Sequence, residues 1–231
     1  MTQDTSRTGD NKKYVYFIRH GQDVQGSQDL FQSPDSPLTE LGKEQAHFVA
    51  DRVRDLGAEV ILTSTMIRAR ETAYALQEAT GLPLHEVDLF REYIPPSALF
   101  GVSRTSGEGR VYIDAMIERV NDPSWHYADE DNYHDLHARA VQALDHLIAR
   151  PESHIIVVTH AGFMRVMLTA MMTEGAPDPL MTSRFMRFLR PMHTGITICR
   201  YKPTAVRRNK WRMVAWNDHA HLGDTLRNEP V

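Results

Sequence analysis

Two apolar segments, far apart in the chain, each run straight into a histidine. Residues 14–18 precede Arg19-His20-Gly21, and residues 153–159 precede His160-Ala161-Gly162. Both segments are rich in β-branched and aromatic side chains, and their lengths are those of buried strands. Ligands of α/β proteins bind beyond the carboxyl ends of parallel strands. If the two strands are neighbours, both imidazoles open onto one crevice, and the chain is constrained to a sheet built around that crevice.

Other segments alternate between the two periodicities of secondary structure. Helical spacing runs from Thr39, a suitable N-cap, to Gly57, a suitable C-cap, and resumes at 66–80 after Ser64 and Thr65, which can cap that helix. Helices are also predicted at 133–150, from 160 to 169 and at 179–189, and strands at 58–63, 84–87, 196–201 and 211–216. This alternation predicts a three-layer α/β/α sandwich with a mostly parallel central sheet.

The remaining segments divide the chain without creating a second domain. Residues 1–12 are polar and are expected to form a loose tail before a single domain at 13–231. Residues 22–37 lack periodicity, and a second irregular stretch, about 94–132, starts with Pro95-Pro96 and contains a helical segment at 110–120. We interpret this second stretch as a lid over the sheet, too short to hold a core of its own.

Composition places this domain among soluble proteins. The chain has 231 residues, 42% of them hydrophobic, and a formal net charge of −4, so no strong field attracts nucleic acid or membrane. A single cysteine, Cys199, excludes an internal disulfide and is typical of a reducing compartment. The N-terminus lacks the apolar segment of a signal peptide, and no apolar run could span a bilayer. We therefore expect a cytoplasmic protein; its oligomeric state cannot be predicted.

The strand ends carry the residues that phosphoryl chemistry requires. Arg19 and Arg68, the latter in the first turn of a helix, offer guanidinium groups that match phosphate oxygens. Neutral His20 is a competent nucleophile, and His160 can stabilise charge on the transferring oxygens. Glu92, which follows a strand, is the best candidate to give a proton to the leaving alcohol. Alternatives remain open: Arg70 for Arg68, and Glu86 or Glu108 for Glu92.

Five segments in order resemble the histidine phosphatase superfamily, the phosphoglycerate-mutase-like proteins. They are Arg19-His20-Gly21, residues 36–46 (SPLTELGKEQA), residues 63–73 (TSTMIRARETA), Phe90-Arg91-Glu92, and residues 158–162 (VTHAG). Arg-His-Gly alone is a weak signal, but five segments spread over nearly the whole chain are a strong one.

The resemblance implies a mechanism and a set of site residues. His20 would form a phosphohistidine, while Arg19, Arg68 and His160 hold the phosphoryl group and Glu92 acts as acid and then as base. We add Gly21, Ala161 and Ser27 as expected phosphate contacts. The resemblance also implies no metal and no cofactor, a small phosphorylated substrate, and inorganic phosphate as product.

The chain departs from the family pattern in several places, and its departures from the mutase branch favour a phosphatase over a mutase. An asparagine common after Arg-His-Gly is replaced here by Gly26 or Ser27, and residues 129–132 (DEDN) replace a frequent Gly-Glu-Ser. The mutase pattern Glu-Arg-His-Tyr-Gly is replaced by residues 92–95 (EYIP), and the lid is not strongly basic. The alternatives are a cofactor-dependent phosphoglycerate mutase-type phosphotransferase and a non-catalytic protein that binds phosphorylated ligands.

Further clusters of histidine or basic residues have simpler interpretations. His126, His134 and His137 lie near one another in the sequence, and His134 and His137 share a helical face, but a metal site there, or at His219 and His221, is disfavoured because no third ligand stands at suitable spacing. A basic hairpin over 200–212 is expected to be a solvated turn rather than a nucleic-acid site. His193 and Arg104 are candidates for lining the substrate pocket.

Overall fold

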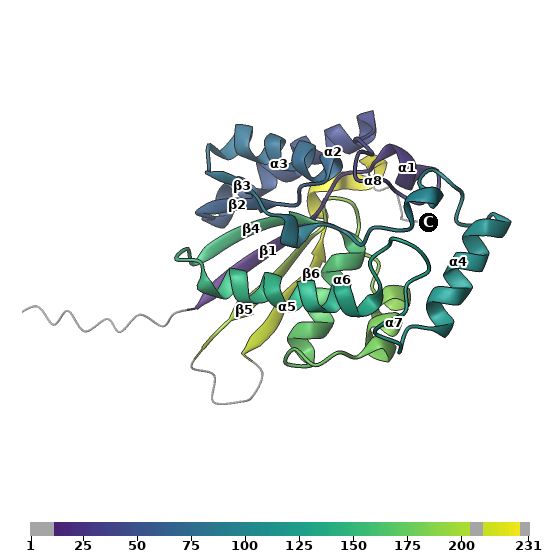
Figure 1. Cartoon of the computed structure of the whole chain (residues 1–231). Helices are drawn as coiled ribbons and strands as arrows, with labels where there is room; N and C mark the ends of the chain where they lie inside the picture. Colours follow the sequence, from purple (N-terminus) through teal and green to yellow (C-terminus); the bar gives the residue numbers. More distant parts are fainter. Residues whose placement is uncertain (1–11, 204–209, 227–231) are drawn as a thin grey trace, which may run out of the picture.

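A six-stranded sheet lies between two layers of helices (Figure 1). The computed structural model describes residues 12–203 and 210–226; most of the predicted tail and the turn of the basic hairpin lie outside these ranges. The strands are β1 (Lys13–Arg19), β2 (Val60–Thr63), β3 (Leu84–Glu86), β4 (His154–Thr159), β5 (Ile196–Tyr201) and β6 (Trp211–Asp218). The α-helices are α1 (Val24–Ser27), α2 (Glu40–Val53), α3 (Ile67–Thr80), α4 (Gly107–Glu118), α5 (Tyr133–Ala149), α6 (Ala161–Met172), α7 (Pro179–Phe188) and α8 (Gly223–Leu226).

The sheet has the strand order β3-β2-β4-β1-β5-β6. Strands β3, β2, β4 and β1 are parallel, while β5 and β6 form an antiparallel pair at one edge. The predicted three-layer α/β/α architecture with a mostly parallel sheet is confirmed. The two histidine-ended strands, β1 and β4, are direct neighbours at the centre, which is the arrangement that a shared crevice requires.

Alternate side chains of the central strands enter two separate cores. In β1, Val15 and Phe17 pack with α5 and α6, whereas Tyr16 and Ile18 pack with α2 and α3. Side chains of a strand point to opposite faces in turn, so a strand covered on both faces is apolar throughout. That is why residues 14–18 and 153–159 read as continuous apolar runs.

The helix that carries Arg68 does not begin as predicted. Thr39 caps α2 as expected, since its Oγ1 accepts a hydrogen bond from the N–H of Gly42. For α3, however, the N-cap residue is Met66, whose side chain makes no capping bond, so the prediction of Ser64 or Thr65 as caps was wrong. Ser64 Oγ instead accepts from the backbone of Met66 and faces His160, and the Thr65 hydroxyl donates to Asp88.

The lid and the loop after β1 share a small apolar cluster. Phe31, from the loop at 22–37, is buried against Leu99 and Tyr112 of the lid. The backbones are joined as well, because Phe31 N–H donates to Val102 O and Gly101 N–H donates to Phe31 O, both at 2.9 Å. The lid helix α4 stands beyond the carboxyl ends of the parallel strands in Figure 1. The two irregular segments are therefore packed against each other beyond the carboxyl ends of the parallel strands.

Two glycines let the loop after β1 press against α2. A Cβ on Gly21 would lie 2.4 Å from the carbonyl oxygen of Gly42, and a Cβ on Gly42 would lie 2.1 Å from that of Gln22. Both distances are far below van der Waals contact, and both involve backbone atoms that cannot rotate away. Packing against α2 alone is thus a sufficient reason for the glycine of Arg-His-Gly, independent of any contact with a ligand.

Replacing Gly42 by alanine should destabilise the fold. The new methyl group would force apart the backbones of α2 and the loop, and overpacking of this kind costs about 1–3 kcal/mol. Urea unfolding of the Gly42→Ala variant measures the loss. The matched control is Gly107→Ala in the first turn of α4, where no atom lies within 4 Å of the added Cβ. Equal stability of the two variants would contradict this account.

Candidate active site

The parallel pairing of β1 with β4 brings the two histidines together. Arg19 lies opposite Thr159 in the register, and the N–H of His20 donates to Thr159 O at 3.0 Å. The next residue in each chain segment is therefore a histidine at the same sheet edge. The rings of His20 and His160 are 5.0 Å apart between centroids, and both side chains are buried.

His20 presents one ring nitrogen with a free lone pair. Its Nδ1 lies 2.7 Å from the carbonyl oxygen of Gly21, and because a carbonyl only accepts, Nδ1 carries the proton. Burial, and then the positive charge of Arg68, hold the pKa of His20 well below its usual range, so the ring is neutral at physiological pH. Neutral imidazole with Nδ1 protonated leaves Nε2 as a nucleophile.

Arg19 is held in place by the segment that precedes β5. Its Nη1 donates to Pro191 O at 2.7 Å, and its Nη2 lies 2.8 Å from Nε2 of His193. A guanidinium only donates, so His193 Nε2 must accept and the ring must be neutral. Burial, followed by the charge of Arg165, lowers the pKa of Arg19 to about 10, which leaves it cationic near neutrality.

Arg68 comes to the same place from the first turn of α3. Its Nη1 donates to Ser33 O at 3.0 Å and its Nη2 to Met66 Sδ at 3.2 Å, and the whole side chain is only 1% exposed. Burial lowers the pKa of Arg68, while the carboxylates of Asp23 and Glu92 raise it. A second buried cation therefore lies within electrostatic reach of His20.

The alternatives to Arg68 and Glu92 lie at the surface. Arg70 Nε forms an ion pair with Glu86 Oε1 at 3.0 Å, and both side chains are more than a third exposed. Glu108 is exposed in the first turn of α4. The structure thus brings none of the three into the group formed by His20, His160 and the two buried arginines.

Glu92 caps the helix that starts after His160. Its two carboxylate oxygens accept hydrogen bonds from the N–H groups of Gly162 at 2.8 Å and Phe163 at 2.7 Å, and one also accepts from Tyr93 N–H at 3.1 Å. Helix N-termini favour anions because their first N–H groups have no partner within the helix. A Cβ on Gly162 would lie 2.6 Å from the carboxylate, so glycine is needed there. The carboxylate is therefore held in one orientation beside His160.

Four buried nitrogens around His20 have no hydrogen-bond partner among the described residues. They are Arg19 Nε, Arg68 Nε, His160 Nδ1 and His193 Nδ1. Nε of arginine is a donor, and Nδ1 of His193 must be one because its Nε2 accepts. Unpaired buried donors are costly, and the residues that carry these nitrogens all lie within electrostatic reach of His20, which fits a ligand with several acceptor oxygens. Two cations beside neutral imidazoles match a phosphoryl group in charge and in hydrogen bonding.

Comparison with known proteins assigns the fold around this site. The sequence profile of the Histidine phosphatase superfamily (branch 1) matches residues 15–219, nearly the whole chain. The chain belongs to the histidine phosphatase superfamily. The resemblance seen in the sequence is thereby confirmed.

Two curated superfamily members illustrate the similarity at different lengths. A probable phosphoglycerate mutase of Erwinia tasmaniensis is 26% identical over 218 residues, 93% of this chain and 97% of its own. A protein of the same name from Yersinia enterocolitica is 44% identical over 69 residues, which cover 29% of this chain and 32% of that protein.

Solved structures share the fold at lower identity. A mycobacterial glucosyl-3-phosphoglycerate phosphatase has a TM-score of 0.69 at 21% identity, covering 89% of this chain and 99% of that protein. A phosphoserine phosphatase of Entamoeba histolytica has a TM-score of 0.70 at 20% identity, covering 91% and 99%. At these identities the similarity establishes the histidine phosphatase fold.

The remaining expected phosphate contacts are placed less favourably. Gly21 N–H donates to Thr72 Oγ1 at 3.1 Å, so this donor is already used. Ala161 is the first residue of α6, next to the N–H groups that bind Glu92. Ser27 is exposed on α1, and its hydroxyl donates to Val24 O at 2.8 Å. We therefore leave Ser27 out of the proposed site.

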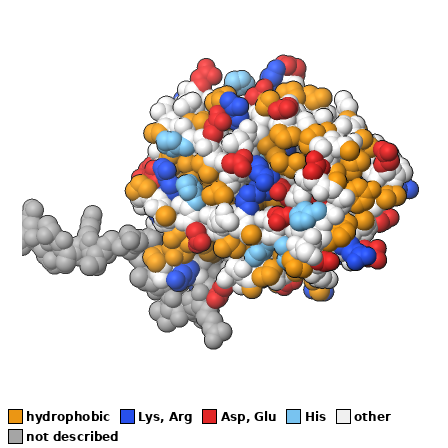
Figure 2. Space-filling model, viewed as in Figure 1, with side chains coloured by type: hydrophobic (Ala, Val, Ile, Leu, Met, Phe, Trp, Pro, Cys, Tyr) orange, Lys and Arg blue, Asp and Glu red, His pale blue; other side chains and the backbone are white. Residues whose placement is uncertain are grey.

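Two of the histidines in the clusters outside the site have hydrogen-bond partners in the protein. His126 Nε2 lies 2.7 Å from Asp135 Oδ2, and His221 Nε2 lies 3.1 Å from Thr194 Oγ1. Within residues 12–203 and 210–226, no three His, Cys, Asp or Glu side chains gather as a metal site. On the face seen in Figure 2, side chains of both charge signs are interspersed.

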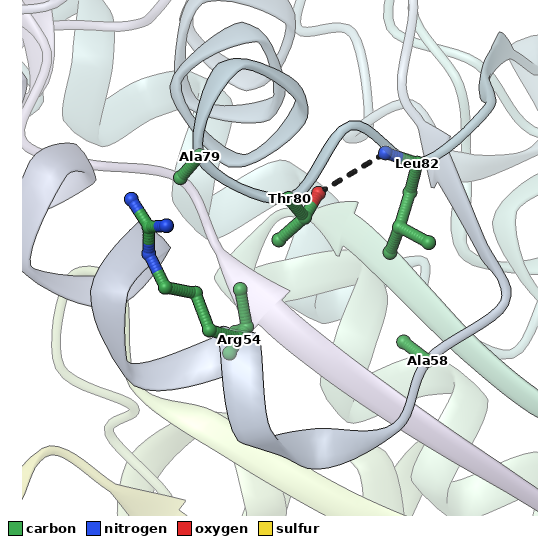
Figure 3. Close-up of a pocket in the computed structure, with 6 residues that line it drawn as sticks. Arg54, Ala58, Ala79, Thr80 and Leu82 are labelled. Carbon is green, nitrogen blue, oxygen red and sulfur yellow. Dashed lines mark hydrogen bonds between the residues drawn. The ribbon is translucent and has the colours of Figure 1, made fainter.

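A cavity of about 220 Å³ lies at the opposite end of the sheet (Figure 3). It is bounded by the ends of α2 and α3 and by residues that precede β2 and β3, whereas the histidines follow β1 and β4. Its charged member, Arg54, pairs with Asp51, and Thr80 Oγ1 accepts from Leu82 N–H. The lining residues are Val53, Arg54, Ala58, Ala79, Thr80 and Leu82. Nothing here resembles a catalytic site.

No helix in the described part of the chain is long and apolar enough to cross a bilayer.

Sequence reasoning overlooked the residues that hold the site residues in position. Ser64 Oγ contacts His160 Nε2 at 2.8 Å, and Thr72 binds the backbone of Gly21. Serine and threonine have no distinctive signal in such positions, although Ser64 directly follows a strand. His193 was predicted to line the pocket, and the structure places its ring 6.0 Å from that of His20.

The stability of the protein should fall as the pH drops below about 6.5, the ordinary pKa of histidine. Burial holds the pKa values of His20, His160 and His193 well below that value in the folded state, so the unfolded chain binds more protons there. Removing one such ring by His193→Asn should flatten the slope by up to about 1.4 kcal/mol per pH unit.

Urea unfolding between about pH 5 and pH 7 measures that slope in phosphate-free buffer. His47→Asn, on the exposed face of α2, serves as the control for loss of a surface imidazole. An unchanged slope in His193→Asn would contradict the neutral, buried state assigned to His193.

Proposed function

We propose that this chain is a metal-independent phosphatase that hydrolyses a small phosphomonoester through a phosphohistidine on His20. The observation that carries the proposal is the state of His20: a buried, neutral ring whose Nδ1–H is bound to Gly21 O, leaving Nε2 free beside two buried arginines. A nucleophile that stays unprotonated among cations is suited to attack an anionic phosphoryl group.

The first step transfers the phosphoryl group to His20. The Nε2 lone pair forms a P–N bond while the ester P–O bond breaks, and the leaving oxygen takes a proton from the Glu92 carboxyl group. Arg19, Arg68 and His160 stabilise the charge on the equatorial oxygens. Because hydrogen bonds to Pro191 O and Ser33 O fix the guanidinium groups of Arg19 and Arg68, these two cations need no rearrangement during the reaction.

The second step returns the enzyme to its starting state. Glu92, now a carboxylate, accepts a proton from water as the water oxygen attacks phosphorus. The P–N bond breaks, its electron pair returns to His20 Nε2, and inorganic phosphate leaves. The three backbone N–H bonds to Glu92 keep the group oriented for both proton transfers.

The names of the structural neighbours support a small anionic substrate. They include a glucosyl-3-phosphoglycerate phosphatase with inorganic phosphate and a phosphoserine phosphatase with phosphoserine or 3-phosphoglyceric acid. All are phosphatases whose ligands are small phosphorylated molecules. We therefore propose a small phosphorylated molecule as the substrate class of this chain, without assigning any one of these substrates to it.

A phosphoglycerate mutase is the second candidate, because the Erwinia relative that matches over nearly its full length carries that name. A mutase passes the phosphoryl group to a second phosphorylated molecule and so has to hold more negative charge than a phosphatase. Residues 94–132 contain three basic and seven acidic side chains, which disfavours such an acceptor at the lid. We therefore favour water as the acceptor.

Replacing the nucleophile should abolish phosphate release. We expect His20→Ala to lower kcat/KM by more than about a thousandfold on a panel of phosphomonoesters in EDTA, since the covalent step is lost. Arg68→Ala should also be severely impaired, whereas its matched control Arg70→Ala, two residues away at the surface, should retain activity. A wild-type protein that binds phosphate but releases none would instead indicate a non-catalytic binding protein.

The fate of the phosphoryl group distinguishes the two candidates. In a phosphatase, turnover in ¹⁸O-labelled water transfers the label to inorganic phosphate. Added phosphoglycerates should not lower the rate of this labelling by taking up the phosphoryl group. A coupled assay that detects interconversion of phosphoglycerates, stimulated by a bisphosphate and faster than hydrolysis, would establish a mutase and overturn the present proposal.

A further inference from the structure

The two ends of the lid are hydrogen-bonded to each other close to Glu92. Asp131 N–H donates to Ile94 O at 3.1 Å, and Ile94 N–H donates to Asp131 Oδ2 at 3.1 Å. Both residues border the lid, residues 94–132, and Tyr93 alone separates Ile94 from Glu92. The base of the lid is therefore continuous with the backbone that carries the proposed proton donor.

The Asp131 carboxylate forms ion pairs with two arginines at this junction. Arg91 binds it in a bidentate manner, with Nη2 to Oδ1 at 3.1 Å and Nη1 to Oδ2, and Arg139 Nη2 reaches Oδ2 at 3.2 Å. All three side chains are one-fifth exposed or less. Burial alone would raise the pKa of Asp131, but the hydrogen bond and charge of Arg91 lower it. The carboxylate is thus ionised and balances two cations.

Arg139, from α5, also donates hydrogen bonds to the backbone at Glu92. Its Nη1 donates to Arg91 O and its Nη2 to Glu92 O, the latter at 3.2 Å. Its guanidinium also lies over the ring of Phe163, 4.5 Å from the centroid, and the N–H of Phe163 binds the Glu92 carboxylate. Arg139 therefore contacts the carbonyl of Glu92 and a residue that orients its carboxylate.

We infer that Asp131 and Arg139 are positioning residues that fix the Glu92 carboxyl group for proton transfer and tie it to the base of the lid. Asp131 orients Arg139, and Arg139 holds the backbone of Glu92 against α6. Neither residue needs to touch substrate for this role. The inference rests on the proposed function, because it assigns an effect to Glu92 as proton donor.

A pair of substrates separates this role from a merely structural one. An alkyl phosphomonoester needs a proton on its leaving oxygen, whereas p-nitrophenolate leaves as a stable anion with little need of one. Damage to Glu92 or its positioning should therefore slow the alkyl ester far more than p-nitrophenyl phosphate. The ratio of the two kcat/KM values is unaffected by partial loss of folded protein.

We expect Asp131→Asn and Arg139→Lys each to lower this alkyl-to-aryl ratio by about tenfold or more, in the same direction as Glu92→Gln. The alkyl ester is the one that the wild type hydrolyses fastest. The matched control is Asp129→Asn, an exposed lid carboxylate that accepts from Ser97 N–H at 2.9 Å, and it should leave the ratio unchanged.

The outcomes distinguish the inference from the function on which it rests. If Glu92→Gln lowers the ratio but Asp131→Asn and Arg139→Lys do not, the positioning role is overturned while the proposed function stands. If Glu92→Gln leaves the ratio unchanged, Glu92 is not the proton donor, and the proposed mechanism falls together with the inference.

Discussion

The parallel hydrogen bonding between β1 and β4 is the constraint on which the candidate site depends. Its register places Arg19 opposite Thr159, so the residue that follows each strand is a histidine at the same edge of the sheet. A shift by one residue would turn every side chain of one strand to the other face and exchange the two cores. The packing of alternate side chains into the two cores, which selects this register, therefore also determines the distance between His20 and His160.

Burial sets the charge states in this site. Neutral imidazoles lie beside buried guanidiniums, because desolvation costs a titratable histidine its proton long before it costs arginine one. The acidic side chains of Asp23 and Glu92 lie near the arginines and raise the pKa of Arg68. Asp23 is itself fully buried and accepts hydrogen bonds from Ser36 and Gln32.

Local patterns in the sequence were sufficient to predict the strands, the long helices and the candidates at the strand ends. Continuous apolar runs identify β1 and β4 because both faces of the sheet are covered, and Arg68 follows from the position of α3. The junction at Asp131 could not be predicted, since its partners Arg91 and Ile94 lie some forty residues away and charged residues in a lid usually face solvent. The predicted N-cap of α3 was wrong, because the Ser64 hydroxyl forms hydrogen bonds with His160 and with the backbone of Met66 instead.

The shared cluster around Phe31 has a consequence for how such a protein can change its specificity. The loop that buries Phe31 in the lid also supplies the Ser33 carbonyl that holds Arg68. A substitution in the lid that repacks this cluster will therefore shift Arg68, a cation of the proposed phosphoryl site, even without touching substrate. If Arg68 binds phosphate as proposed, new specificity in this scaffold has to be acquired by matched changes in two distant segments, the loop after β1 and the lid, because neither can be altered independently of Arg68.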